Sequence, residues 1–137
     1  DKVGVTDQLE TPDQAQASTS VIDRTILDRL LDDVGPENAK AVIDAFLQEL
    51  ERQTTVLEGA ADGADLDAIS HAAHRLKSSA ASFGASRLSR LTESIEQAAK
   101  TGNLPTAVEQ MPEFRSLSKA SLEAMNRFRD EIFGPVS

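Results

Sequence analysis

Apolar residues recur every three or four positions along most of this chain, and this period restricts its fold more than any other feature. Segment 36–57 shows the pattern well, with Val42, Ile43, Phe46, Leu47, Leu50 and Leu57 on one side of a helix. β-branched residues are scattered and no alternation of apolar and polar residues persists, so strands are not expected. The pattern predicts an all-α protein.

Glycine and proline divide the periodic sequence into five expected helices. They cover 21–35, 36–57, 65–83, 86–100 and a last segment from near Pro105 to about Ile132. Pro112 is expected to bend or delay the last helix. Short connections between long amphipathic helices favour antiparallel neighbours. We therefore expect an up-down-up-down antiparallel four-helix bundle with an additional N-terminal helix.

The first part of the chain differs from the rest. Residues 1–20 are polar and lack a sustained apolar period, so we expect a disordered tail or a linker there and one domain over 21–133. The chain begins with Asp1 rather than methionine, which is expected of a fragment or a processed product. No segment is apolar and long enough to span a membrane or resembles a signal peptide.

Charge is unevenly distributed along the chain. The formal net charge of -9 argues against binding nucleic acid, which depends on neutralising phosphates. Residues 68–92 nevertheless contain no acidic side chain, while Arg75, Lys77, Arg87 and Arg90 all fall there. This basic segment suits an anionic ligand or an acidic partner. A chance gap between acidic residues is the alternative.

Both histidines lie in one expected helix, within the run HAAHRLKSSAASFGA at 71–85. With about 100° of rotation per residue, one arc of this helix is apolar and buried. It comprises Leu66, Ile69, Ala73, Leu76, Ala80 and Phe83. His74 lies about 130° from the centre of that arc, and His71 points more directly to solvent. His74 is therefore expected at the boundary of the bundle or outside it.

Small residues follow His74 on its own side of the helix. Ser78 and Ala81 leave room for another protein to approach the ring, and Lys77 adds a cation beside it. These features suit a nucleophilic histidine that a macromolecular phosphoryl donor must reach. Two ordinary surface histidines remain the alternative at this point.

Other chemistries fit less well. Two histidines without any cysteine, and with no carboxylate nearby, supply too few ligands for a metal site. No G-x-S-x-G elbow and no glycine-rich nucleotide loop is present. We therefore expect no metal, no cofactor and no ATP-dependent activity in this chain.

The run HRLKSSAASFGA resembles the signature of histidine phosphotransfer (HPt) domains of two-component phosphorelays. That signature has an accepting histidine, an apolar residue two positions on, lysine three on, small residues after it, and glycine ten after the histidine. The matching residues are His74, Leu76, Lys77, Ser78, Ser79 and Gly84. Ser78 stands where many members have glycine, and the variant is similar to that of LuxU-type phosphotransfer proteins. His71 lacks the matching residues that follow His74.

This resemblance implies a function. His74 is expected to accept a phosphoryl group from a receiver-domain aspartate and to pass it to another receiver, while Lys77 neutralises phosphoryl charge. Residues expected to contact the partner are His71, Arg75, Ser78, Ala81, Gly84 and Arg87. Any Mg²⁺ is expected in the receiver. The domain is expected to be a cytoplasmic monomer, either alone or as the C-terminal part of a membrane sensor kinase.

Helical geometry adds Glu96 to the expected site. If 65–83 and 86–100 form an antiparallel hairpin, equal rise along both helices places residues near 95–97 level with His74. Several HPt domains have a polar residue there that bonds the imidazole. Glu96 would accept a proton from one ring nitrogen and leave the other as the nucleophile. An ordinary surface glutamate is the alternative.

Two other function classes remain open from the sequence. One is a helical interaction module in which His74 never carries phosphate. The other is a histidine kinase dimerisation domain, which also presents a histidine on a helix bundle. Such domains typically have an acidic residue directly after the histidine, where this chain has Arg75.

Overall fold

The computed structural model describes residues 21–134, and every regular element in that range is an α-helix. The helices are α3 (Arg24–Val34), α4 (Pro36–Asp62), α5 (Leu66–Ser82), α6 (Ser86–Lys100), α7 (Leu104–Glu109) and α8 (Met111–Phe133). The all-α prediction is confirmed. Residues 1–20 lie outside the described range, so the expected tail or linker stays a prediction.

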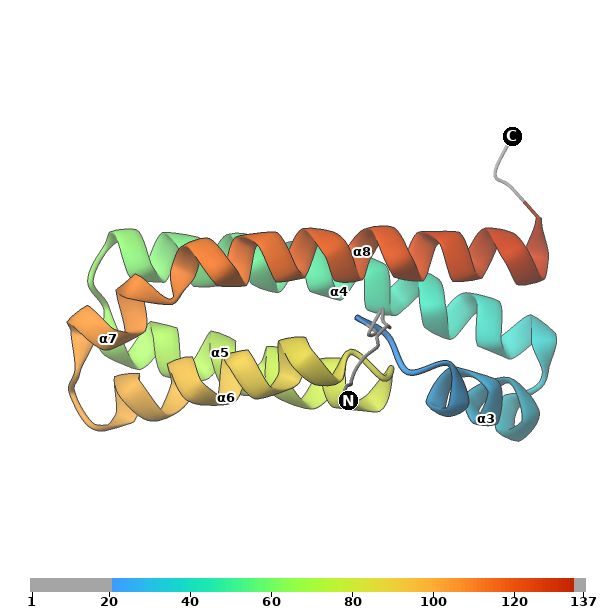
Figure 1. Cartoon of the computed structure of the whole chain (residues 1–137), viewed down its shortest axis with the longest axis horizontal. Helices are drawn as coiled ribbons and strands as arrows, with labels where there is room; N and C mark the ends of the chain where they lie inside the picture. Colours follow the sequence, from blue (N-terminus) through green and yellow to red (C-terminus); the bar gives the residue numbers. More distant parts are fainter. Residues whose placement is uncertain (1–20, 135–137) are drawn as a thin grey trace, which may run out of the picture.

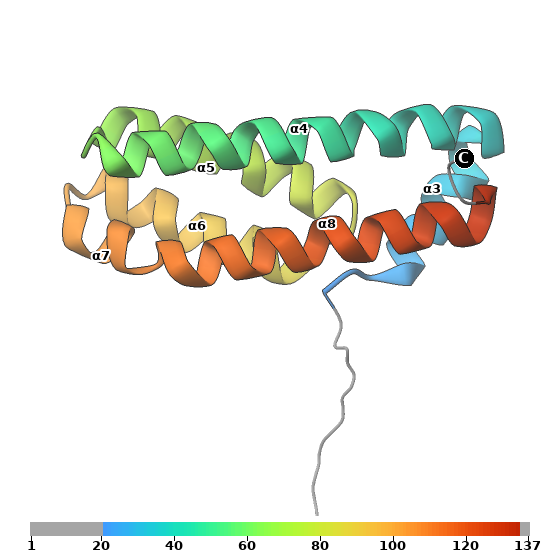
Figure 2. The same cartoon turned by 90° about the horizontal axis from the view of Figure 1, so that it is seen from above.

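Four long helices form the predicted antiparallel bundle. α4, α5, α6 and α8 run alternately in opposite directions, and α5 and α6 form a hairpin on one side of it (Figures 1 and 2). α4 and α8 extend beyond the closed end of this hairpin. The additional N-terminal helix, α3, lies at that end and packs against α4. It therefore covers apolar surface that the shorter hairpin leaves open.

One continuous core joins these helices. Its largest fully buried apolar side chains are Phe114, Leu27, Ile43, Leu50, Leu57, Ile69, Leu76, Leu88, Ile95 and Met125. Complete burial of such a side chain contributes about 1.5–3 kcal/mol. The core residues recur at the spacings that predicted the helices, so burial of these stripes holds the bundle together.

Two helix boundaries differ from the sequence prediction. α4 continues through Gly59 to Asp62, because its buried face extends to Ala60. The last expected helix is two helices, α7 and α8, separated at Gln110. Pro112 stands in the first turn of α8, where its missing N–H has no partner to lose. The predicted effect of Pro112 is confirmed, but a single helix from Pro105 was wrong.

A tight turn joins α5 to α6. Gly84 has φ +78° there, a left-handed conformation that glycine adopts without strain. Its carbonyl oxygen accepts a hydrogen bond of 2.8 Å from the backbone N–H of Asp23. A Cβ at Gly84 would lie 2.8 Å from the carbonyl oxygen of Asp23. Glycine is therefore required for the segment entering α3 to pack on this turn.

Candidate functional site

α5 and α6 pack closely against each other, and both bury small side chains. The buried alanines of the two helices are Ala72, Ala73, Ala80, Ala98 and Ala99. The hydroxyl of Ser89 on α6 also donates a hydrogen bond of 3.1 Å to the carbonyl oxygen of Lys77 on α5. This close packing fixes the register of the hairpin, and it places His74 level with Glu96, as equal helical rise predicts.

His74 and Glu96 are in direct contact. The Nδ1 atom of His74 lies 3.0 Å from Oε2 of Glu96. The His74 side chain is 60% exposed, whereas that of Glu96 is 1% exposed. Because a carboxylate only accepts hydrogen bonds, Nδ1 carries the proton and donates it. The neutral ring then keeps its lone pair on Nε2, and Glu96 is not an ordinary surface glutamate.

Two lysines surround the Glu96 carboxylate. The Nζ atom of Lys77 lies 2.8 Å from Oε1, and that of Lys100 lies 3.0 Å from Oε2. Oε2 of Glu96 is thus shared between His74 and Lys100. Sequence analysis did not single out Lys100. Its spacing of four residues after Glu96 is the usual one for an ion pair within a helix, and this was the available signal.

These contacts set the protonation states of the cluster. Burial by itself raises the pKa of Glu96, but the neighbouring ammonium groups of Lys77 and Lys100 outweigh it and hold the pKa at about 2. In return, the hydrogen-bonding carboxylate of Glu96 raises the pKa of Lys77. Glu96 is therefore anionic and Lys77 cationic at physiological pH, so the imidazole lies beside fixed charges of both signs.

The other predicted residues of α5 lie around this cluster. His71 lines the same open hollow as His74, together with Arg75 and Lys100. Ser78 and Ala81 are exposed, as the helical angles predict. The guanidinium of Arg75 lies 3.4 Å from a carboxylate oxygen of Glu49, so this arginine connects α5 to α4 beside the hollow.

Two residues expected in the partner surface lie elsewhere. Gly84 is buried in the turn against the backbone of Asp23, so it contributes no exposed surface beside His74. Arg87 lies nine positions before Glu96 on α6, which is about 13 Å along the axis and about 180° around it. Arg87 instead lines hollows with residues of α3 and α8. Both residues therefore lie away from His74, because spacing from His74 says nothing of the direction a turn or a second helix takes.

Between residues 21 and 134, no group of three His, Cys, Asp or Glu side chains is arranged to hold a metal ion. None of the helices in this range combines the length and apolar character needed to cross a membrane.

Comparison with known proteins agrees with this arrangement. The model of the Hpt domain family matches residues 41–130. The phosphorelay protein LuxU of Vibrio harveyi is 37% identical over 90 residues, which cover 64% of this chain and 76% of that protein. LuxU of Vibrio cholerae serotype O1 is 34% identical over 83 residues, covering 61% and 74%.

A solved structure shares the fold. The crystal structure of histidine-containing phosphotransfer protein B from Pseudomonas aeruginosa PAO1 superposes with a TM-score of 0.77. The match covers 82% of this chain and 97% of that one, at 20% sequence identity. At this identity, the likeness supports the helical bundle itself.

Proposed function

The chain belongs to the Hpt domain family, and on that premise we propose that His74 carries a phosphoryl group between receiver domains of a two-component phosphorelay. Histidine phosphotransfer is the function that the family and the LuxU relatives support. One observation supports the assignment to His74. The side chain of His74 is mostly exposed, yet it forms a hydrogen bond to the buried carboxylate of Glu96. His71, the other histidine, has no such partner among the described residues.

The proposed step uses the free ring nitrogen as nucleophile. The lone pair of His74 Nε2 attacks the phosphorus of an aspartyl phosphate, and the bond from phosphorus to the aspartate oxygen breaks. The aspartate leaves as a carboxylate. Nδ1 keeps its proton, so the phosphorylated ring gains a positive charge beside the Glu96 carboxylate. The reverse step returns the phosphoryl group to another receiver aspartate.

The lysines act on the charge of the transferred group in this proposal. A phosphoryl group on Nε2 brings negative charge close to the Glu96 carboxylate, where the ammonium groups of Lys77 and Lys100 already lie, and Lys100 lines the same hollow as His74. Their attraction favours transfer to His74, and Glu96 keeps both cations in place beforehand. The Mg²⁺ expected for transfer belongs to the receiver in this scheme.

The partner surface is proposed around the exposed side of α5. Ser78 and Ala81 keep the approach to the ring open, and His71 and Arg75 border it. Receiver domains are the partners that the family implies. The expected monomeric state, the cytoplasmic location and the absence of nucleic-acid binding stay predictions.

The test is phosphotransfer from a phosphorylated receiver to the wild-type protein, His74→Gln and His71→Gln. We expect label that is stable to alkali and labile to acid in the wild type and His71→Gln, and none in His74→Gln. His71→Gln is the matched control because it removes the other histidine of the same helix. Label that survives in His74→Gln but not in His71→Gln would refute the assignment. No transfer from a broad panel of receivers would favour the helical interaction module.

A further inference from the structure

A second basic surface lies away from His74, along the seam between α6 and α8. Three hollows at or near this seam share lining residues: one lies between residues 21–24 and α8, one between residues 22–25 and the start of α6, and one between α6 and α8. The first contains Ile22, Arg24 and Arg127, and the second shares Ile22 and Arg24 with it. The third shares Arg87 and Arg90 with the second. Neighbouring hollows share lining residues and therefore adjoin one another, and the three together are called the α6–α8 groove below.

The groove contains arginines that lack carboxylate partners. Arg87, Arg90 and Arg127 are all exposed, and none has a carboxylate oxygen within 4.0 Å among residues 21–134. Most other lysines and arginines in this range form ion pairs. In a chain with a net charge of -9, carboxylates outnumber basic groups. Three arginines that line the same groove and have no carboxylate partner in the described range are therefore unusual. Their guanidinium groups offer paired donors that match carboxylates.

The acidic residues of the groove mostly have other partners. Glu131 pairs with Arg24 at 3.0 Å, and the Asp23 carboxylate accepts a hydrogen bond from the backbone N–H of Thr25. Glu113 is the remaining carboxylate among the lining residues. The lining as a whole has four arginines against these three carboxylates, so its formal charge is +1. The positive charge left unpaired within residues 21–134 lies on Arg87, Arg90 and Arg127.

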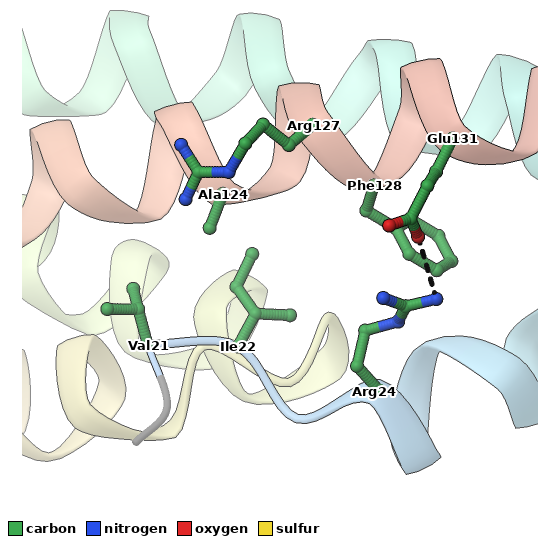
Figure 3. A pocket seen from close by; sticks show the side chains of 7 residues that line it. All are labelled: Val21, Ile22, Arg24, Ala124, Arg127, Phe128 and Glu131. Atoms are coloured by element: carbon green, nitrogen blue, oxygen red, sulfur yellow. Dashed lines mark ion pairs between the residues drawn. The ribbon is translucent and has the colours of Figure 1, made fainter. Parts of the chain in front are cut away.

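Apolar side chains line the groove between the arginines. Figure 3 shows Ile22 pointing toward α8, with Ala124 and Phe128 on the helix above it, while Arg127 extends away from the Arg24–Glu131 pair. Leu91 and Leu117 continue the apolar lining beyond Arg90. A ligand that fits this groove combines negative charges with apolar groups.

The groove is separate from the histidine site. Arg87 and Glu96 lie about 180° apart around α6. His74, Lys77 and Lys100 line none of the three hollows. A molecule bound in the groove therefore leaves the ring of His74 accessible.

We propose that the α6–α8 groove binds an acidic, partly apolar peptide segment of a partner protein, with Arg87 and Arg90 as the main anchors. The negative charge of the rest of the molecule favours a short peptide over a larger anionic ligand. Nucleic acids and anionic membranes present extended negative surfaces, which an acidic protein repels outside the groove. A peptide contacts the groove alone, and carboxylates alternating with leucines match its arginines and its apolar lining.

The experiment measures binding of a fluorescein-labelled peptide of four Glu-Glu-Leu repeats to the full chain by fluorescence anisotropy. A Gln-Gln-Leu peptide of the same length shows whether charge is required. The variant is the double substitution Arg87→Gln with Arg90→Gln. The matched control, Arg29→Gln with Lys119→Gln, removes the same charge from exposed positions that do not line the groove.

We expect the double arginine variant to raise the Kd of the acidic peptide by about tenfold or more, as loss of two charge-assisted contacts implies. The control variant should bind nearly as the wild type does, and phosphotransfer to His74 should be unchanged in both. Equal weakening in both variants would show attraction by net charge alone and overturn the proposal, as would equal binding of the Gln-Gln-Leu peptide.

A further arm of the experiment tests acidic residues of this chain that precede the groove residues in the sequence. Residues 1–20 contain Asp7, Glu10 and Asp13. If the peptide binds only after Asp7→Asn, Glu10→Gln and Asp13→Asn are introduced together, the groove's occupant is the chain's own segment, and the assignment to a partner is overturned. If neither form of the chain binds the peptide, the proposal also fails.

Discussion

Replacing Glu96 by glutamine is the sharpest test of the charge cluster at the histidine. The side chain keeps its shape but loses the charge that attracts Lys77 and Lys100. A pKa of about 2 in the folded protein, against an ordinary 4.5, means that the carboxylate form is favoured by folding. That difference corresponds to about 3 kcal/mol of stability at pH 7.

The pH dependence has a definite sign. Because the pKa of Glu96 is lowered on folding, its contribution is fully present well above pH 4.5 and is lost as the pH falls toward 2. At pH 3 about 1.4 kcal/mol should remain by the same linkage. The difference in unfolding free energy between the wild type and Glu96→Gln should therefore shrink by about 2 kcal/mol between pH 7 and pH 3.

Urea unfolding followed by circular dichroism at several pH values measures this difference directly. Other carboxylates, including Asp44 with its own lowered pKa, titrate in both proteins and cancel. Glu123→Gln is the control, because Glu123 is exposed on α8 and has no ion pair among residues 21–134, so its replacement should change stability little at any pH. High salt should reduce the effect, since Lys100 is 53% exposed. A difference that stays constant from pH 7 to pH 3 would refute the reasoning.

Three further outcomes are expected. Gly84→Ala should destabilise the fold by about 2–4 kcal/mol in urea unfolding, because it adds a close backbone contact to left-handed strain. Gly102→Ala, with φ +79° and open space around it, should cost only about 1 kcal/mol; equal losses would contradict the contact argument. Lys77→Met should slow phosphotransfer by about tenfold while Lys119→Met leaves it unchanged, and matching rates would remove Lys77 from the mechanism. Ala73→Leu should cost about 1–3 kcal/mol because it overpacks a fully buried position beside His74, with slower transfer; an unaffected protein would show that the core tolerates the larger side chain.

The sequence alone was sufficient to predict the helices and to single out His74 as the proposed phosphoryl acceptor. Stripes at spacings of three and four predict helices because one face of each must be buried, and this holds whatever the neighbours are. His74 was distinguished from His71 by local spacing to Lys77 and the small residues after it. Such information lies within a few turns of one helix, where geometry is known in advance.

The sequence also predicted the register of the hairpin, but it did not predict the burial of Glu96. Equal rise along two antiparallel helices placed Glu96 level with His74, and the structure has them in contact. The sequence left open whether Glu96 is a surface residue. Its 1% exposure results from the close approach of α5 and α6 and from two lysines that cover it.

Only the tertiary structure decided which charges meet and which surfaces stay open. Lys100 joins the site because its carboxylate partner is shared across helices, and Gly84 leaves the expected partner surface because the segment before α3 packs on it. Arg87 faces α8 rather than His74 because rotation along α6 carries it to the opposite side. Sequence spacing gives distance and angle within a helix, whereas contacts between helices depend on packing of the whole bundle.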